Sequence, residues 1–413
     1  MIAYLLHQSS KQAKLVQRSF STLSRIKSVF EVENPSNSSK SNLFPLIGSS
    51  IVYDDNEEEL RYPSVSTSIC DMKYENPPSD DLSQQFKQSI LQYFLGEGLY
   101  KSLTNRLLFL PTAGVKTNNH AASIFLATNG LCSRVFIPYP SSPQFQRTLR
   151  INRIKSNDYR FVNYRTGFLN FAQMLEDFYL CPNESCFVVN VPGCFPTGLC
   201  LNETEWNELF KCCVENHHIL WFNASHLGLR SGNGFVDFSP IRECIKLHID
   251  CILSLDLESS LMLPGLGASA LAVVSGDDNE SDFLSGMGRV VDGASLYGMK
   301  LCSSFFSDEK KVEEWESECG EQVKRFASIR AQLCEGNKDS LAFLTRQEGP
   351  FALLPFSRKK LQSLNESAGL PIDGILNLSS LTTDTLPFLR ELLQSSANTS
   401  RSHSSFPSYS SVS

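Results

Sequence analysis

The sequence predicts an α/β fold: a large domain with a mostly parallel sheet flanked by helices, followed by a smaller α+β domain. Short apolar runs alternate with amphipathic helical patterns, which is typical of a parallel sheet covered on both faces. After Ser307 the pattern changes to one long charged helix and a short mixed segment. The 413 residues are enough for both domains.

The predicted strands are apolar runs without polar alternation, as expected for strands buried on both faces in a parallel sheet. Proline residues end two of them, at Pro138 and Pro192. The five runs cover residues 134–137, 185–191, 218–222, 251–257 and 271–274.

Two helices are predicted with most detail. Asn202 is a favourable N-cap for a helix over Glu203–Asn216. A second helix over Asp308–Leu333 carries an apolar stripe that includes Trp315 and Phe326. Residues 351–393 are interpreted as the small α+β unit.

Composition excludes several classes of protein. The net charge of -7 and pI near 5.6 do not favour nucleic-acid binding. No run of eighteen apolar residues predicts a membrane span, and no serine-hydrolase elbow, zinc-protease or P-loop motif occurs. The thirteen cysteines are interpreted as core residues in a reducing compartment rather than as a metal site or disulfides, and no metal site is predicted.

The two ends differ from the rest. Residues 1–28 are basic, rich in serine and free of acidic residues, which predicts a mitochondrial transit peptide and a matrix location; a disordered basic arm is the alternative. Residues 395–413 are rich in serine and are predicted to be a disordered tail.

Several segments, in order along the chain, together resemble the aspartate aminotransferase family, the class-I aminotransferases that depend on pyridoxal phosphate. They are LRYPSV at 60–65, FLGEG at 94–98, RVFIPYPSSP at 134–143, Pro196-Thr197-Gly198 with Trp206, and LSSLTTDTLPFLRELL at 378–393. The resemblance implies the fold type I of these enzymes. It divides the chain into an N-terminal arm with part of the small domain (29–61), the large domain (62–332) and the small C-terminal domain (333–394).

The resemblance also implies a dimer that transfers an amino group between aspartate and 2-oxoglutarate, with a lysine that forms a Schiff base with the cofactor. That lysine position corresponds to Leu257, and no lysine occurs from Leu247 through Met299. Leucine can neither bind the cofactor covalently nor move a proton. We therefore expect the cofactor to be absent or bound without a covalent bond.

The family's aspartate at the pyridine nitrogen corresponds to Asn223, and its tyrosine to His226. Asparagine can form a hydrogen bond to the ring but brings no charge, so it weakens the electron-sink role of the cofactor. His226 is either a general acid or a polar residue at a strand end.

Four further positions depart from the family pattern. Phe195 replaces an asparagine that donates to the cofactor's phenolic oxygen, and Ser142 replaces the tryptophan that stacks on the ring. Gly265 replaces the phosphate-binding arginine, and Ile375 replaces the arginine that pairs with the substrate carboxylate.

Some positions still fit the family. Ser254 corresponds to a phosphate-contacting serine, although a serine also suits an ordinary strand end. Lys300 corresponds to an arginine that reaches the neighbouring subunit's substrate, with a surface lysine as the alternative. The segment Pro111–Asn118 is expected to be the phosphate loop, with Thr112, Gly114 and Thr117 as candidates.

The leading hypothesis is a non-catalytic relative that acts as a homodimer, or as a heterodimer with an active aminotransferase, without nucleic-acid or membrane partners. One alternative is an active aspartate transaminase with displaced catalytic groups. Another is a sensor of an amino acid or oxo-acid, although Leu257 and Ile375 make the cleft more apolar and disfavour dicarboxylates.

Overall fold

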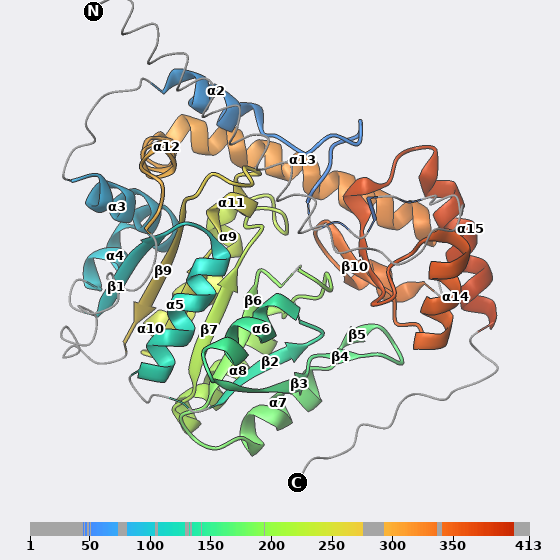
Figure 1. Ribbon diagram of the computed structural model, residues 1–413, viewed down its shortest axis with the longest axis horizontal. Coiled ribbons are helices and arrows are strands. Elements are labelled where there is room, and N and C mark those ends of the chain that lie inside the picture. The colour runs from blue at the N-terminus through green and yellow to red at the C-terminus, as the bar shows by residue number, and fades with distance from the viewer. Residues whose placement is uncertain are drawn as a thin grey trace, which may run out of the picture. The chain divides into compact units, whose positions relative to one another are not determined.

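The seven-stranded sheet at the centre of the computed structural model has the order β1-β9-β8-β7-β6-β2-β3 (Figure 1). The neighbours from β8 to β3 pair in parallel, whereas β9 is antiparallel to both β1 and β8. The strands are β1 Leu107–Thr112, β2 Arg134–Tyr139, β3 Lys155–Arg160, β6 Cys186–Val191, β7 Ile219–Ala224, β8 Cys251–Leu255 and β9 Ser269–Val274. The mostly parallel α/β fold is confirmed.

The structure describes residues 44, 46–47, 49, 51–72, 81–103, 106–128, 132, 134–141, 143–193, 195–275, 293–336 and 341–399. The predicted transit peptide over 1–28 and the candidate site residue Ser142 therefore lie outside the described residues. Residues 42–413 group as one unit by their contacts.

Side chains on both faces of the sheet are buried. Trp221 and Ile252 point into one apolar cluster, with residues from helices α5 (Val115–Thr128) and α6 (Pro143–Ile151). Phe222 and Leu253, one residue further along each strand, belong to a larger cluster on the other face. Because successive side chains of a strand point to opposite faces, this double burial produces the unbroken apolar runs of the sequence.

The larger cluster also receives helices from before and after the sheet strands. They are α2 Pro63–Asp71, α3 Leu82–Leu95, α7 Phe171–Leu180, α8 Glu203–Asn216, α10 Ser239–Lys246 and α12 Leu296–Phe306. Short helices complete this part of the chain: α4 Glu97–Ser102, α9 Gly234–Asp237 and α11 Leu257–Ser260, with a small ribbon formed by β4 Val162–Asn163 and β5 Phe168–Leu169.

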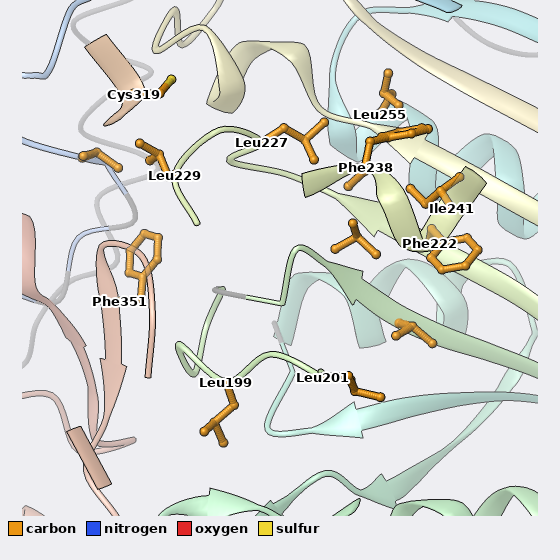
Figure 2. Packing of buried hydrophobic residues seen from close by; sticks show 14 of the residues in the cluster. Leu199, Leu201, Phe222, Leu227, Leu229, Phe238, Ile241, Leu255, Cys319 and Phe351 are labelled. Atoms are coloured by element: carbon orange, nitrogen blue, oxygen red, sulfur yellow. The ribbon is translucent and has the colours of Figure 1, made fainter. Parts of the chain in front are cut away.

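Helix α13 (Glu309–Cys334) contacts α2 and α12 near its beginning and the C-terminal elements near its end (Figure 1). The C-terminal elements are η3 Ala342–Arg346, β10 Phe351–Leu353, α14 Arg358–Ala368, β11 Ile375–Asn377, η4 Leu378–Ser380 and α15 Thr385–Thr399. Of these, η3, η4 and α15 contact α13. The apolar cluster continues from Phe222 and Leu255 at the sheet to Phe351 of β10 (Figure 2).

The two helices predicted with most detail are present. Helix α8 has the predicted bounds, and Asn202 caps it by accepting the Glu205 backbone N–H at 2.9 Å. Trp315 and Phe326 are buried on α13 as predicted. Eight of the cysteines are buried in the described part of the chain.

The apolar run over residues 271–274 predicts another parallel strand, and this is wrong, because β9 is antiparallel to both of its neighbours. Its side chains are buried on both faces, which explains the apolar run, but burial carries no information about strand direction. Helix α15 also continues to Thr399, beyond the predicted start of the tail at 395, and the tail from residue 400 lies outside the described residues.

Candidate functional site

A cavity of about 720 Å³ opens at the carboxyl ends of β6, β7 and β8. In open α/β sheets this edge is where ligands bind, because loops of variable sequence meet there. The N-terminal segment, the first turn of α5, α6, the loops after these strands and α11 all contribute to its wall. The lining includes Ile51, Val52, Glu59, Leu60, Val115, Lys116, Asn119, Pro138, Ser141, Phe145, Thr148, Val188, Asn190, Phe195, Pro196, Asn223, Ser225, His226, Asp256, Glu258, Ser259, Met262 and Pro264.

Leu257 begins α11 just after β8 and has no exposed surface. It belongs to the apolar core and is not among the residues that line the cavity. Its neighbours Asp256 and Glu258 do line the cavity. Leu257, which the sequence predicts at the Schiff-base position, is therefore a packing residue with an acidic side chain on either side of it.

Asn223 lies one residue before the end of β7, beside Asn190 of β6, and the two residues are paired across the strands. The Asn223 amide nitrogen donates to the Asn190 side-chain oxygen at 3.0 Å. The Asn223 Oδ1 is buried and has no hydrogen-bond partner among the described residues. This leaves an acceptor in the cavity wall that a ligand N–H or O–H could satisfy.

His226 follows β7 in a left-handed conformation, with φ of 56°. Its ring lies near those of Phe195 and Phe351, with centroids 5.9 and 5.3 Å away. Burial lowers the pKa of His226 to about 4, so the imidazole is neutral near pH 7. A neutral imidazole is a poor proton donor at this pH. The arrangement therefore favours the interpretation of His226 as a polar residue at a strand end over its interpretation as a general acid.

Ser254 is fully buried within β8. Its hydroxyl accepts the Trp221 indole N–H at 3.0 Å and donates to the Asn119 side-chain oxygen at 3.3 Å. Thr112 is likewise buried and bonds Asn118, whose amide reaches the Leu255 carbonyl at 3.2 Å. Both hydroxyls therefore join α5 to the sheet.

Glu258 occupies the end of the cavity near α5. Its carboxylate accepts the Gly267 backbone N–H at 2.7 Å and the Gly265 N–H at 3.3 Å. A Cβ built on Gly114, which directly precedes α5, would lie 3.7 Å from the same carboxylate. Gly265, the position of the family's phosphate-binding arginine, thus contributes a backbone N–H to an internal acid.

Asp256 caps α11 by accepting the Ser259 backbone N–H at 3.2 Å. Burial raises the pKa of Asp256 to about 6, against the opposing effect of the hydrogen bonds from Ser259. Glu59 and Lys116 are exposed charged residues of the lining. The charged lining is thus three acids and one lysine, which disfavours anionic ligands.

Of the predicted site positions in the described part of the chain, Leu257, Ser254, Gly265, Ile375 and Lys300 are not among the lining residues. Ile375 is paired with Leu353 across the small sheet, and its backbone N–H bonds the Asp373 side chain at 3.0 Å. Lys300 lies half-buried on α12. The structure therefore gathers Asn223, Phe195 and His226 at the cavity but not these five positions.

Sequence reasoning missed the roles of Asp256, Glu258, Asn190 and Lys116. The signal for the first two was present, since they flank Leu257 directly after an apolar strand. Lys116 lies within the segment already expected to be a phosphate loop. Asn190 becomes visible only once β6 and β7 are paired in register.

The described residues show neither a metal cluster nor a membrane-spanning helix. Within the described residues, no group of three or more His, Cys, Asp or Glu side chains is arranged to hold a metal ion. No helix in the same part of the chain is both long and apolar enough to cross a bilayer.

The fold and the position of the cavity define an α/β protein of the fold-type-I aminotransferase class, whose cofactor is pyridoxal phosphate. The family model described as "Aminotransferase class I and II" matches residues 72–378, and the chain belongs to this family.

The chain is 22% identical to the mitochondrial aspartate aminotransferase of Gallus gallus, over 62% of this chain and 63% of that protein. It is 22% identical to the mitochondrial aspartate aminotransferase of Xenopus tropicalis, over 84% of each chain. Among solved structures it resembles an aromatic-amino-acid aminotransferase from Burkholderia pseudomallei covalently bound to pyridoxal phosphate, with a TM-score of 0.76 and 17% identity. That match covers 85% of this chain and 92% of the other.

The residues of the cleft do not fit this cofactor. Leu257 offers no amine and is packed in the core. The backbone N–H groups of Gly265 and Gly267, which could hold a phosphate, already bind the Glu258 carboxylate. The unpartnered Asn223 oxygen would suit the group as an acceptor for a ring N–H.

Proposed function

We propose that this aminotransferase-family protein has lost transamination and acts as a non-catalytic dimerising or regulatory relative of the active enzymes. The observation that carries the proposal is the buried leucine at the Schiff-base position, within a stretch from 247 to 299 that has no lysine. Without that amine the chain has no group to form the covalent bond or to move the substrate proton.

The other cleft residues support the same conclusion. The Asn223 amide brings no negative charge to hold a pyridine ring protonated. Neutral His226 is packed against Phe195. Phe195 stands at the position where the family has an asparagine that donates a hydrogen bond to the cofactor. The fold is kept while each of these changes weakens the chemistry.

An active transaminase is the second candidate, and one observation favours it. Lys116 lines the cavity from the first turn of α5 and is the one lysine among the described lining residues. An active enzyme would need this amine, or one brought by another subunit, to replace the missing lysine.

Transfer of the amino group from aspartate to 2-oxoglutarate, in the presence of pyridoxal phosphate, tests the proposal. We expect no turnover above that of pyridoxal phosphate alone, with an active aspartate aminotransferase as the positive control. Lys116→Ala serves as the matched variant: turnover by the natural chain that disappears in Lys116→Ala would replace our proposal by the second candidate.

The proposed partners are a second copy of the chain or an active aminotransferase. Leu296 and Tyr297, in the first turn of α12, are exposed by 55% and 48% of their surfaces. Lys300, which the family resemblance directs toward a neighbouring subunit, follows one turn later on the same helix. Adjacent exposed apolar side chains beside such a residue support an interface there.

The proposed location is the mitochondrial matrix. It is supported by the basic, acid-free leader over residues 1–28 and by the mitochondrial relatives at 22% identity. A fluorescent fusion of the full chain should reach mitochondria, and one that begins at residue 29 should remain outside them.

A further inference from the structure

The glycine loop after α11 (residues 265–267) and the beginning of α5 both face one carboxylate, that of Glu258. Gly265 and Gly267 both have positive φ, 84° and 71°, which most residues other than glycine rarely adopt. In this conformation their backbone N–H groups donate to the two carboxylate oxygens of Glu258.

The loop is fixed before any ligand arrives. The Ser295 backbone N–H donates to the Gly267 carbonyl at 2.7 Å, and the Ser295 hydroxyl donates to the Leu266 carbonyl at 2.9 Å. Ser295 also caps α12 through the Gly298 N–H at 2.9 Å. The two glycine N–H groups are thus held in place, so an anion that binds there loses little free energy to ordering of the loop.

The carboxylate also lies against the N-terminal end of α5, a helix of fourteen residues. Gly114 directly precedes this helix, with a φ of 141°, and a Cβ at this position would lie 3.7 Å from the carboxylate, an ordinary contact distance. Helix N-termini and converging backbone N–H groups both attract negative charge. Here both act on Glu258, which is also part of the cavity wall.

We propose that Glu258 is an internal ligand that fills the anion-binding end of the cleft and excludes phosphate and phosphorylated compounds from it. A second anion at this place would have to displace the carboxylate from two hydrogen bonds or lie beside its charge, and both are unfavourable. The cleft then accepts only ligands without a phosphate. The inference concerns the same cleft as the proposed function but does not depend on the missing lysine.

Binding of inorganic phosphate, measured by isothermal titration calorimetry at constant ionic strength, tests this inference. Glu258→Ala empties the site, and Glu258→Gln removes the charge but keeps the side-chain volume. We expect phosphate to bind Glu258→Ala about tenfold or more tighter than the natural chain, with a smaller gain for Glu258→Gln. If Glu258→Ala does not fold, Glu258→Gln provides the test, and we expect its phosphate affinity to exceed that of the natural chain.

Glu59→Gln is the matched control, because Glu59 lines the same cavity but its backbone pairs with Tyr53 of the N-terminal segment. It removes one negative charge from the cavity while Glu258 stays in place, so we expect no gain in phosphate affinity. Equal gains in Glu59→Gln and Glu258→Gln would overturn the inference in favour of a general charge effect. Unchanged phosphate affinity in folded Glu258 variants would also overturn it.

Pyridoxal phosphate and pyridoxal provide a second comparison that separates this inference from the proposed function. In Glu258→Ala the phosphorylated compound should bind about tenfold tighter than pyridoxal, whereas the natural chain should bind both equally weakly. A preference of the natural chain for the phosphorylated compound would contradict the inference. Neither outcome depends on whether a covalent adduct forms, which is the test of the missing lysine.

Discussion

Two buried side chains at the cleft respond to pH in opposite directions. Asp256 has a pKa of about 6 in the folded chain because burial disfavours its charged form. Its pKa in the unfolded chain is about 3.9, so its contribution to stability is complete below that value and is lost as pH rises through 6. His226, with a folded pKa of about 4, contributes stability that is lost as pH falls from 6.5 toward 4.

Single variants should reveal each effect, because in the natural chain the two largely cancel between about pH 4 and 6.5. Asp256→Asn keeps a residue that can cap α11 and leaves only the histidine effect. We expect its free energy of unfolding to rise with pH, relative to the natural chain, by up to about 3 kcal/mol.

His226→Asn, in which asparagine tolerates the left-handed backbone, should show a fall of similar size over the same range. Urea unfolding at several pH values measures both variants against the natural chain. Parallel pH profiles for the two variants would show that these groups do not carry the pKa values assigned to them.

Among the elements, α12 combines a buried face with exposed Leu296 and Tyr297 at its beginning. If this turn belongs to a subunit interface, replacing both residues by serine should weaken the dimer by about tenfold or more, because the lost apolar contact would lie at the interface. Light scattering on the protein as it leaves a size-exclusion column measures the molecular mass directly.

Leu180→Ser is the control for this prediction, since Leu180 is 74% exposed at the end of α7 and its loss should leave the mass unchanged. A natural chain that is monomeric at micromolar concentration would contradict the interface. Mixing with an active aminotransferase distinguishes the two kinds of partner: capture of that enzyme supports the heterodimer, and homodimers alone rule it out.

The sequence predicted the elements whose signal is local. The strands around Val188 and Phe222 are apolar because both faces are covered, and α8 follows from its cap at Asn202. Strand β3 has no apolar run that would predict it, because it is a polar edge strand with only Tyr159 buried. Strand β1 was missed as well, since Pro111 ends its apolar run early.

At the scale of the whole molecule, the fold is that of the aminotransferase family, and the proposed change lies in the chemistry of the cleft. The predicted losses at Leu257, Asn223 and Phe195 rest on the residue type alone, because a missing amine, charge or amide is visible in the sequence. The role of Glu258 was not visible, because it depends on backbone N–H groups that the folded loop brings to it. The same holds for the pKa values of Asp256 and His226, which burial determines.

The most direct test of the lost chemistry is trapping with borohydride. The purified chain is incubated with pyridoxal phosphate, reduced and desalted, and its absorption spectrum and intact mass are recorded beside those of an active aspartate aminotransferase. We expect no stoichiometric adduct, because no amine occupies the position of Leu257. One adduct per chain that maps to a single lysine, with Lys116 as the first to examine, would show that the site has been rebuilt and would contradict the proposed loss of the cofactor bond.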